Sequence, residues 1–237
     1  MAEFKILVLL FLLISQAKAQ DLTAIQVLEK SIAYHDPYGN WETFNDSLSI
    51  HLQTPEQPIR KSKIKIDLTN EYFYLRQIKA ADTIIYSIVK DNCKLSINGI
   101  KKPTKKLKKK YDANCEKANL YKNYYTYLYG LPMKLKDKGA IVYKDVIRKS
   151  LKNNEYLVIK VNYREDIGKD TWYFYFNPET YALEAYQFFK DESKNNGEYI
   201  LLNKTENISN IKMPKIRKWF TNKDNKYLGT DILQASN

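Results

Sequence analysis

Two cysteines are the first residues whose type and spacing suggest chemistry. Cys93 and Cys115 are the only cysteines in the 237-residue chain, and 22 positions separate them. Because an even number of cysteines in an exported chain is typical of disulfides, we predict that the two are bonded. Such a bond would tie a strand to the start of the second helix and contribute about 3 kcal/mol for a loop of this size. Two buried free thiols are the alternative.

The histidines and the known catalytic motifs offer little for an active site. The chain has only His35 and His51, whereas a metal site needs several ligands at set spacings. We interpret His35, next to Asp36, as a histidine at a helix C-terminus, where the helix dipole favours a cation. No Gly-x-Ser-x-Gly, His-Glu-x-x-His or glycine-rich phosphate loop is present. The sequence therefore predicts no metal, no cofactor and no enzyme, although a dispersed Ser-His-Asp triad remains open.

A lysine-rich segment at residues 101–110 has the highest local density of positive charge in a chain of net charge +12. We interpret it as an exposed loop. It lacks the aromatic side chains that stack on bases, so we expect no nucleic-acid partner. A solvated, inert loop and a patch for an anionic membrane surface remain open, the latter gaining about 1 kcal/mol per lysine. The lysines concerned are Lys101, Lys102, Lys105, Lys106, Lys108, Lys109 and Lys110.

Aromatic side chains concentrate on two neighbouring predicted strands in the second half of the chain. A strand that is apolar on both faces is usually covered on both, here by core on one side and by a helix or an apolar ligand on the other. We therefore predict a hydrophobic ligand site, with a packed core rimmed by tyrosines as the alternative. The predicted ligand-binding residues are Trp41, Trp172, Phe174, Phe176, Tyr186 and Phe188.

The first twenty residues resemble a secretory leader. Residues 6–14 are apolar without a break, and Ala17-Lys18-Ala19 has the small-x-small pattern of a signal-peptidase site. The apolar run covers about 14 Å of helix, too short for a bilayer core of about 30 Å. We predict a signal peptide at residues 1–19, cleaved near Ala19-Gln20, and a periplasmic or extracellular protein.

The elements that must position these residues are mostly strands. Helical periodicity predicts one helix after Thr23, ending near His35, and a second over residues 112–129. Asn98-Gly99 is typical of a hairpin turn. Alternating apolar residues predict strands at residues 47–52, 64–68, 72–78, 83–89, 94–97, 140–147, 155–163, 171–176, 182–190, 198–208 and 212–221. Residues 227–233 are a candidate for a last strand at an edge of the sheet.

Short connections between these strands predict one antiparallel sheet in a single domain over residues 20–237. Two helices cannot cover so many strands in a flat sheet. We therefore expect a mainly β (α+β) fold: a strongly curved half-barrel of about ten or eleven strands with two helices on its concave side.

The chain resembles a family of secreted flavobacterial proteins of unknown function. That family is distantly similar to the LolA/LolB-type periplasmic lipoprotein carriers, through the Asn-Pro-Glu-Thr-Tyr hairpin at residues 176–183 and the strand that starts near Met213-Pro214. The resemblance implies a curved sheet with an apolar cavity for acyl chains. The lysine-rich segment and the cysteine pair depart from the carriers. The segments that carry the family resemblance are residues 34–41, 124–135, 170–181, 197–200 and 211–215.

Together these observations predict a non-enzymatic binding protein that holds a lipid or another acyl-bearing hydrophobic molecule in the concavity of the sheet. Burial of apolar surface would supply the affinity, at about 25 cal/mol per Å². A secreted enzyme with a dispersed site and a ligand-free envelope interaction protein are the alternatives.

Overall fold

The structure, a computed structural model, describes residues 22–234. The predicted signal peptide at residues 1–19 lies outside these residues. Within residues 22–234, no helix is both long and apolar enough to cross a membrane.

Twelve strands form one antiparallel sheet, slightly more than the ten or eleven predicted. Its spatial order is β5-β4-β3-β2-β1-β12-β11-β10-β9-β8-β7-β6, so each strand pairs with its neighbour in sequence except at the β1–β12 pair. The strands are β1 (Asn45–Gln53), β2 (Arg60–Asp67), β3 (Tyr72–Lys79), β4 (Asp82–Val89), β5 (Asn92–Ile97), β6 (Ala140–Leu151), β7 (Asn154–Tyr163), β8 (Thr171–Phe176), β9 (Leu183–Asp191), β10 (Asn196–Ile208), β11 (Ile211–Thr221) and β12 (Tyr227–Gln234). The strand at residues 227–234 was expected at an edge but lies in the middle of the sheet, because it pairs with both β1 and β11.

Within the described residues, three α-helices and three short 3-10 helices accompany the sheet. Thr23 caps the first helix by accepting a hydrogen bond from the Gln26 amide, while the Gln26 side chain accepts one from the Thr23 amide. The helices are α1 (Ala24–His35), η1 (Asn40–Thr43), α2 (Lys105–Lys110), α3 (Cys115–Tyr129), η2 (Met133–Lys136) and η3 (Glu192–Lys194).

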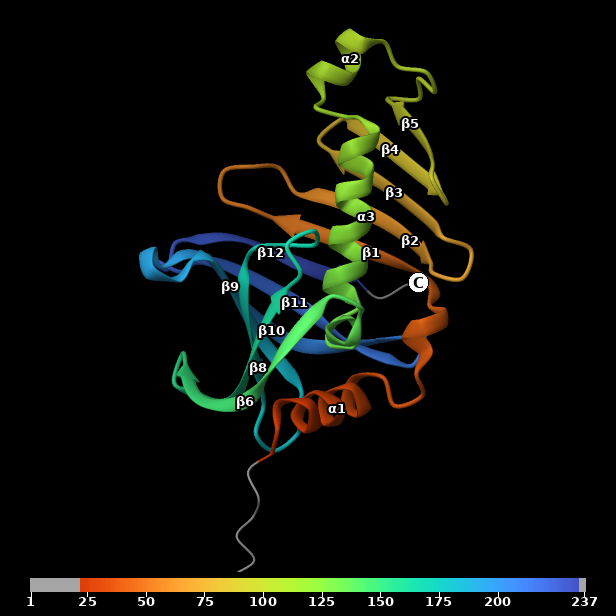
Figure 1. Cartoon of the computed structure of the whole chain (residues 1–237). Coiled ribbons are helices and arrows are strands. Elements are labelled where there is room, and N and C mark those ends of the chain that lie inside the picture. The colour runs from red at the N-terminus through yellow and green to blue at the C-terminus, as the bar shows by residue number, and fades with distance from the viewer. Residues whose placement is uncertain (1–21, 235–237) are drawn as a thin grey trace, which may run out of the picture.

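The sheet is curved and does not close, and two helices lie along its concave side, as predicted (Figure 1). Helix α3 contacts β4 and β5. It starts at the end of the molecule where α2 lies and runs from there along the hollow of the sheet (Figure 1). Helix α1 contacts β6 and β11 at the other end. The arrangement is a half-barrel, in which the first sheet half (β1 to β5) and the second sheet half (β6 to β12) face each other across α3 (Figure 1).

A large hydrophobic core fills the concave side. It includes Leu48 and Ile64 of the first half of the sheet, Phe174 and Ile200 of the second half, and Leu128 of α3. A smaller cluster on other positions of the second half is built around Tyr156, Val158, Tyr173, Tyr175 and Ala185. The strand at residues 171–176 is therefore covered on both faces, because its alternate side chains belong to different clusters.

The lysine-rich segment is partly helical rather than the predicted loop. Thr104 caps α2 by accepting a hydrogen bond from the Leu107 amide, and lysine itself has good helix propensity. Leu107 packs against the core, whereas every lysine of the segment is exposed. The predicted Asn98-Gly99 turn is present. Both residues have positive φ, and Ile97 and Ile100 on either side of the turn exchange backbone hydrogen bonds of 3.2 and 2.9 Å in a single antiparallel bridge.

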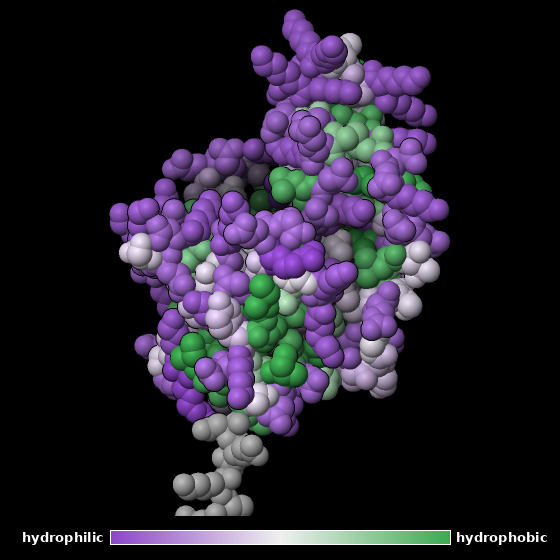
Figure 2. Space-filling model, in the orientation of Figure 1, coloured by the Kyte–Doolittle hydropathy of each residue, from purple (hydrophilic) through white to green (hydrophobic). Residues whose placement is uncertain are grey.

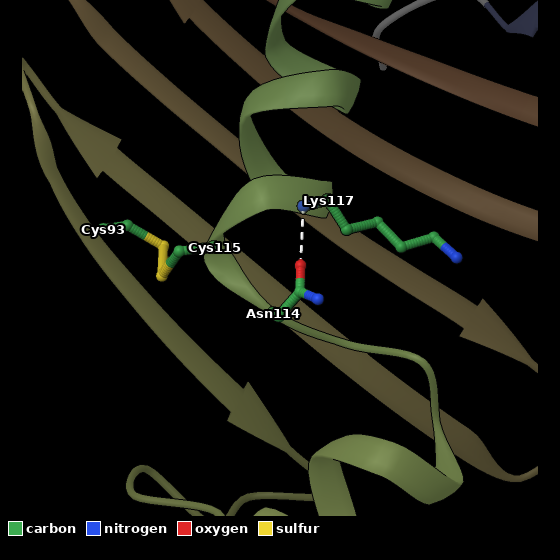
Figure 3. The surroundings of a disulfide bond; sticks show 4 residues. All are labelled: Cys93, Asn114, Cys115 and Lys117. Carbon is green, nitrogen blue, oxygen red and sulfur yellow. Dashed lines mark hydrogen bonds between the residues drawn. A yellow bond between two sulfur atoms is a disulfide. The ribbon is translucent and has the colours of Figure 1, made fainter.

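The predicted disulfide between Cys93 and Cys115 is present and joins β5 to the first turn of α3 (Figure 3). Asn114 caps the same turn, since its side-chain oxygen accepts a hydrogen bond from the Lys117 amide at 2.7 Å (Figure 3). The disulfide therefore fixes the start of α3 to the edge strand β5, while the cap stabilises the first turn of the helix itself.

Candidate ligand-binding cavity

A cavity of about 600 Å³ opens on the concave side where the two sheet halves approach each other. One wall comes from the β2–β3 turn region, a second from α3, and a third from η2 and the nearby ends of β6, β7 and β8. Its size falls within the range of about 300–1,000 Å³ that is usual for small-molecule sites. Its apolar and aromatic lining residues include Ile66, Leu68, Tyr72, Phe73, Tyr127, Ala140, Tyr163, Ile167 and Trp172.

Three aromatic residues connect α3 to the second sheet half inside this cavity. The hydroxyl groups of Tyr127 and Tyr163 share a hydrogen bond of 2.7 Å, and the Tyr127 ring lies edge-on to Trp172 with 5.7 Å between centroids. Burial raises the pKa of Tyr163 to about 12 and raises the pKa of Tyr127 well above its usual range. Both tyrosines are therefore protonated and uncharged at physiological pH.

Charged side chains also line the cavity. Lys134 forms an ion pair with Asp137. Asp67 accepts hydrogen bonds from the backbone amide and from the side chain of Asn70. Both bonds lower the pKa of Asp67, and the side-chain bond has the larger effect. An amphipathic molecule would thus meet apolar side chains together with charges of both signs.

The structure brings four of the six predicted ligand-binding residues into one aromatic cluster. The Trp172 ring lies 4.9 Å from Phe188 and 6.0 Å from Phe174, and Phe174 lies 6.3 Å from Tyr186, between centroids. Trp172 lines the cavity, whereas the other members of the cluster are not among its lining residues. Phe174, Phe176 and Tyr186 are at most 1% exposed and form the core beneath it.

Trp41 lies apart from this cluster, on η1. Its ring stacks on Phe44 at 5.1 Å and approaches the backbone of Gly130 at the end of α3. The Trp41 amide donates to a carboxylate oxygen of Asp36 at 2.8 Å. A part in ligand binding stays a prediction for Trp41, whose observed contacts join η1 to α3.

A buried arginine positions the end of α3 over the sheet. Arg217 on β11 donates hydrogen bonds to the carbonyl oxygens of Leu128 and Pro214 at 3.2 and 2.9 Å, and its guanidinium lies 3.9 Å from the centre of the Tyr129 ring. Asp231 on β12 is paired with Arg217 in register, and burial raises its pKa. These contacts hold the helix that forms one wall of the cavity.

His35 anchors α1 to the sheet as a neutral group, which corrects the interpretation of a dipole-stabilised cation. Its Nε2 accepts a hydrogen bond from the Leu183 amide at 2.9 Å. Its Nδ1 therefore carries the proton and donates it to the Lys212 carbonyl at 2.6 Å. Burial, which outweighs the Lys212 hydrogen bond, lowers the pKa of His35 to about 4. The adjacent Asp36 accepts hydrogen bonds from the Asn40 and Trp41 amides of η1 instead, so the two side chains diverge.

Most residues that line the cavity carried no recognisable signal in the sequence. Ile66, Phe73, Tyr127 and Tyr163 lie on four different elements, and only the curvature of the sheet brings them together. Tyr127 does fall within the tyrosine-rich segment that contributed to the family resemblance.

Comparison with solved structures shows the same fold in LolA-type proteins. A LolA superfamily protein from Nitrosomonas europaea is similar at a TM-score of 0.50 and 11% identity, with 90% of this chain and 92% of that chain covered. A domain assigned to outer membrane lipoprotein-sorting proteins, from Vibrio parahaemolyticus, has a TM-score of 0.51 and 7% identity, with 89% and 90% covered. No match was found among curated proteins.

The LolA-type fold suggested by the sequence is therefore confirmed. At the level of sequence, residues 3–235 match one protein family, and these residues make up nearly the full chain. The chain belongs to the family of unknown function DUF6503.

Proposed function

We propose that the protein binds a lipid or another acyl-bearing hydrophobic molecule in the concave cavity and carries it without covalent chemistry. The observation that carries this proposal is the cavity of about 600 Å³ with its largely apolar and aromatic lining. Burial of apolar surface contributes about 25 cal/mol per Å², or about 0.8 kcal/mol per methylene group. A single alkyl chain would therefore supply useful affinity without any charged contact.

The geometry of the cavity supports an amphipathic ligand. Trp172 and Phe73 offer apolar contact inside, while Lys122 and Lys138 are lining residues for which no ion pair is found within residues 22–234. The similarity to a lipoprotein-sorting domain supports the same class of ligand. The apolar leader and the disulfide support a place of action outside the cytoplasm, in the periplasm or beyond the cell.

The test is uptake of a fluorescent fatty acid by the purified protein. We expect parinaric acid to bind, and its affinity to fall at least about tenfold when Thr126→Phe narrows the cavity from α3. Thr126 is a half-buried lining residue. Asn119→Phe is the matched control, because Asn119 is exposed on the same helix and is not a lining residue.

Native mass spectrometry of protein purified from its own host complements this titration. Co-purified lipid that is displaced by parinaric acid would support the carrier. Failure of the wild-type protein both to retain lipid and to take up the probe would contradict it. That result would favour a ligand-free interaction protein, which the tightly packed Phe174, Phe176 and Tyr186 under α3 also allow.

A further inference from the structure

A rigid, strongly basic projection lies at one end of the molecule, beyond the edge strand β5. Helix α2 stands at this end in Figure 1, and Figure 2 shows the same end covered by hydrophilic side chains. All seven lysines of residues 101–110 are exposed. We call residues 98–112 the lysine tip.

No acidic neighbour neutralises the lysine tip through an ion pair. Within residues 22–234, none of its seven lysines has a carboxylate within salt-bridge distance. Asp112 pairs instead with Lys117. Asp82 accepts hydrogen bonds from the Tyr111 hydroxyl at 2.7 Å and from the Asn98 side chain at 2.9 Å. The positive charge of the tip is therefore directed to the solvent.

The tip is ordered in spite of its own repulsion. Helix α2 has six residues, five of them lysine, and like charges at i, i+3 and i, i+4 destabilise a helix. Leu107 and Tyr111 pack against the core, and Pro103 is buried. The disulfide at Cys115 follows directly. A cluster of cations held in a fixed arrangement binds a surface of closely spaced anions more strongly than the same cations on a flexible loop. The fixed cluster loses no backbone entropy on binding.

We propose that the lysine tip docks the protein on an anionic phospholipid bilayer. Membrane surfaces with anionic lipids attract clustered lysines within a Debye length of the headgroups. The tip also carries Ile100, an apolar side chain that is 51% exposed beside Lys101 and could enter the interface. Nucleic acid is disfavoured, because Tyr111, the only aromatic residue of the tip, donates its hydroxyl to Asp82 and packs on the core.

This inference goes beyond the proposed carrier function and does not require that the cavity hold a ligand. The tip and the cavity are linked through α3, which begins at Cys115 and lines the cavity with Lys122, Asn123, Thr126 and Tyr127. At 1.5 Å per residue, about 10–18 Å of helix separates its first residue from these lining residues. Docking through the tip would hold the cavity close to the membrane without placing it in the bilayer.

The test is flotation of the full-length mature protein with lipid vesicles. We expect it to bind vesicles of equal parts phosphatidylglycerol and phosphatidylcholine, to ignore pure phosphatidylcholine, and to be released by salt. Replacing Lys105, Lys106, Lys109 and Lys110 by Gln should weaken binding by more than about a hundredfold, at about fivefold per lysine. Glutamine has a helix propensity similar to that of lysine, so thermal stability should not fall.

A second variant with the same loss of charge is the control. Lys61, Lys63, Lys218 and Lys223 are exposed and lie away from the tip on β2, β11 and the β11–β12 turn. Replacing these four by Gln should change binding less than about tenfold, through net charge alone. Equal loss in the two variants, full binding by the tip variant, no binding by the wild type, or equal affinity for single-stranded DNA would each overturn the proposal. Fatty-acid uptake should be the same in both variants, which separates this test from that of the carrier.

Discussion

At the scale of single residues, the contact between Trp41 and Gly130 sets a sharp steric limit. A Cβ at Gly130 would lie 2.3 Å from Cζ2 of Trp41. The backbone at Gly130 has φ −89° and ψ −2°, which any residue can adopt. The glycine is therefore required by close approach rather than by backbone conformation.

We expect Gly130→Ala to lower the free energy of unfolding by about 1–3 kcal/mol, the usual cost of overpacking. Urea unfolding would measure it. Gly168→Ala is the matched control, because a Cβ there meets nothing within 4 Å. Adding Trp41→Phe should reduce the cost of the alanine, and an equal cost in both backgrounds would refute the proposed clash.

His35 makes a second residue-scale prediction, a pH-dependent stability. The pKa of His35 is about 4 in the folded protein against an ordinary value of 6.5, so the unfolded chain binds more protons between these two pH values. The contribution of neutral His35 is complete above pH 6.5 and is lost as the pH falls towards 4. The loss amounts to about 3 kcal/mol.

Urea unfolding across this pH window would measure the loss. His35→Gln should flatten the dependence, at the cost of lower stability near neutral pH. His51→Gln, at the only other histidine, should leave it intact. If the His35 variant retained the full pH dependence, other groups would be responsible.

At the scale of elements, the disulfide between β5 and α3 should stabilise the whole chain through the unfolded state. We expect the double variant Cys93→Ser and Cys115→Ser to lose about 3 kcal/mol, as the chain-entropy model gives for a loop of this length. Hydrogen exchange should quicken first at the start of α3. Reduction of the disulfide in the wild-type protein should lower the free energy of unfolding by the same amount. Unchanged stability would show that the Asn114 cap and side-chain packing are enough to hold the start of α3.

Elements with clear periodicity were predicted closely, and those set by tertiary contacts were not. Every predicted strand is present, because alternation of apolar residues is a direct consequence of a half-buried sheet. Helix α2 was missed, because its five lysines have no apolar period and its order depends on Leu107 and a cap. His35 was misassigned because burial by distant strands decides its charge.

At the scale of the whole molecule, the two sheet halves meet only through the β1–β12 pair within the continuous sheet. We expect them to unfold together. Leu233→Ala removes a fully buried side chain of β12 and should cost about 2–5 kcal/mol. The slope of the urea transition should be unchanged.

Circular dichroism and tryptophan fluorescence should report the same midpoint for this variant. Leu120→Ala is the control, since Leu120 is 63% exposed and the change should cost less than about 0.5 kcal/mol. A biphasic transition would contradict a single cooperative unit.

The curved fold was predictable from the sequence, but the cavity was not. Short links and a shortage of helices require a sheet that bends, whatever its side chains. The cavity depends on how far it bends, because Phe73 and Trp172 lie on strands that are far apart in the sheet order. Of the predicted aromatic strand around Phe174, only Trp172 borders the cavity, because packing decides which rings face open space.

The central pairing of β1 with β12 joins segments from nearly opposite ends of the chain. A newly made chain cannot complete this pair until its last strand has emerged. Until then, two partial sheets would each present a bare hydrogen-bonding edge, which favours aggregation. A chaperone that shields such edges should raise the yield on refolding, and the latest contact to form should be the one at the centre of the sheet.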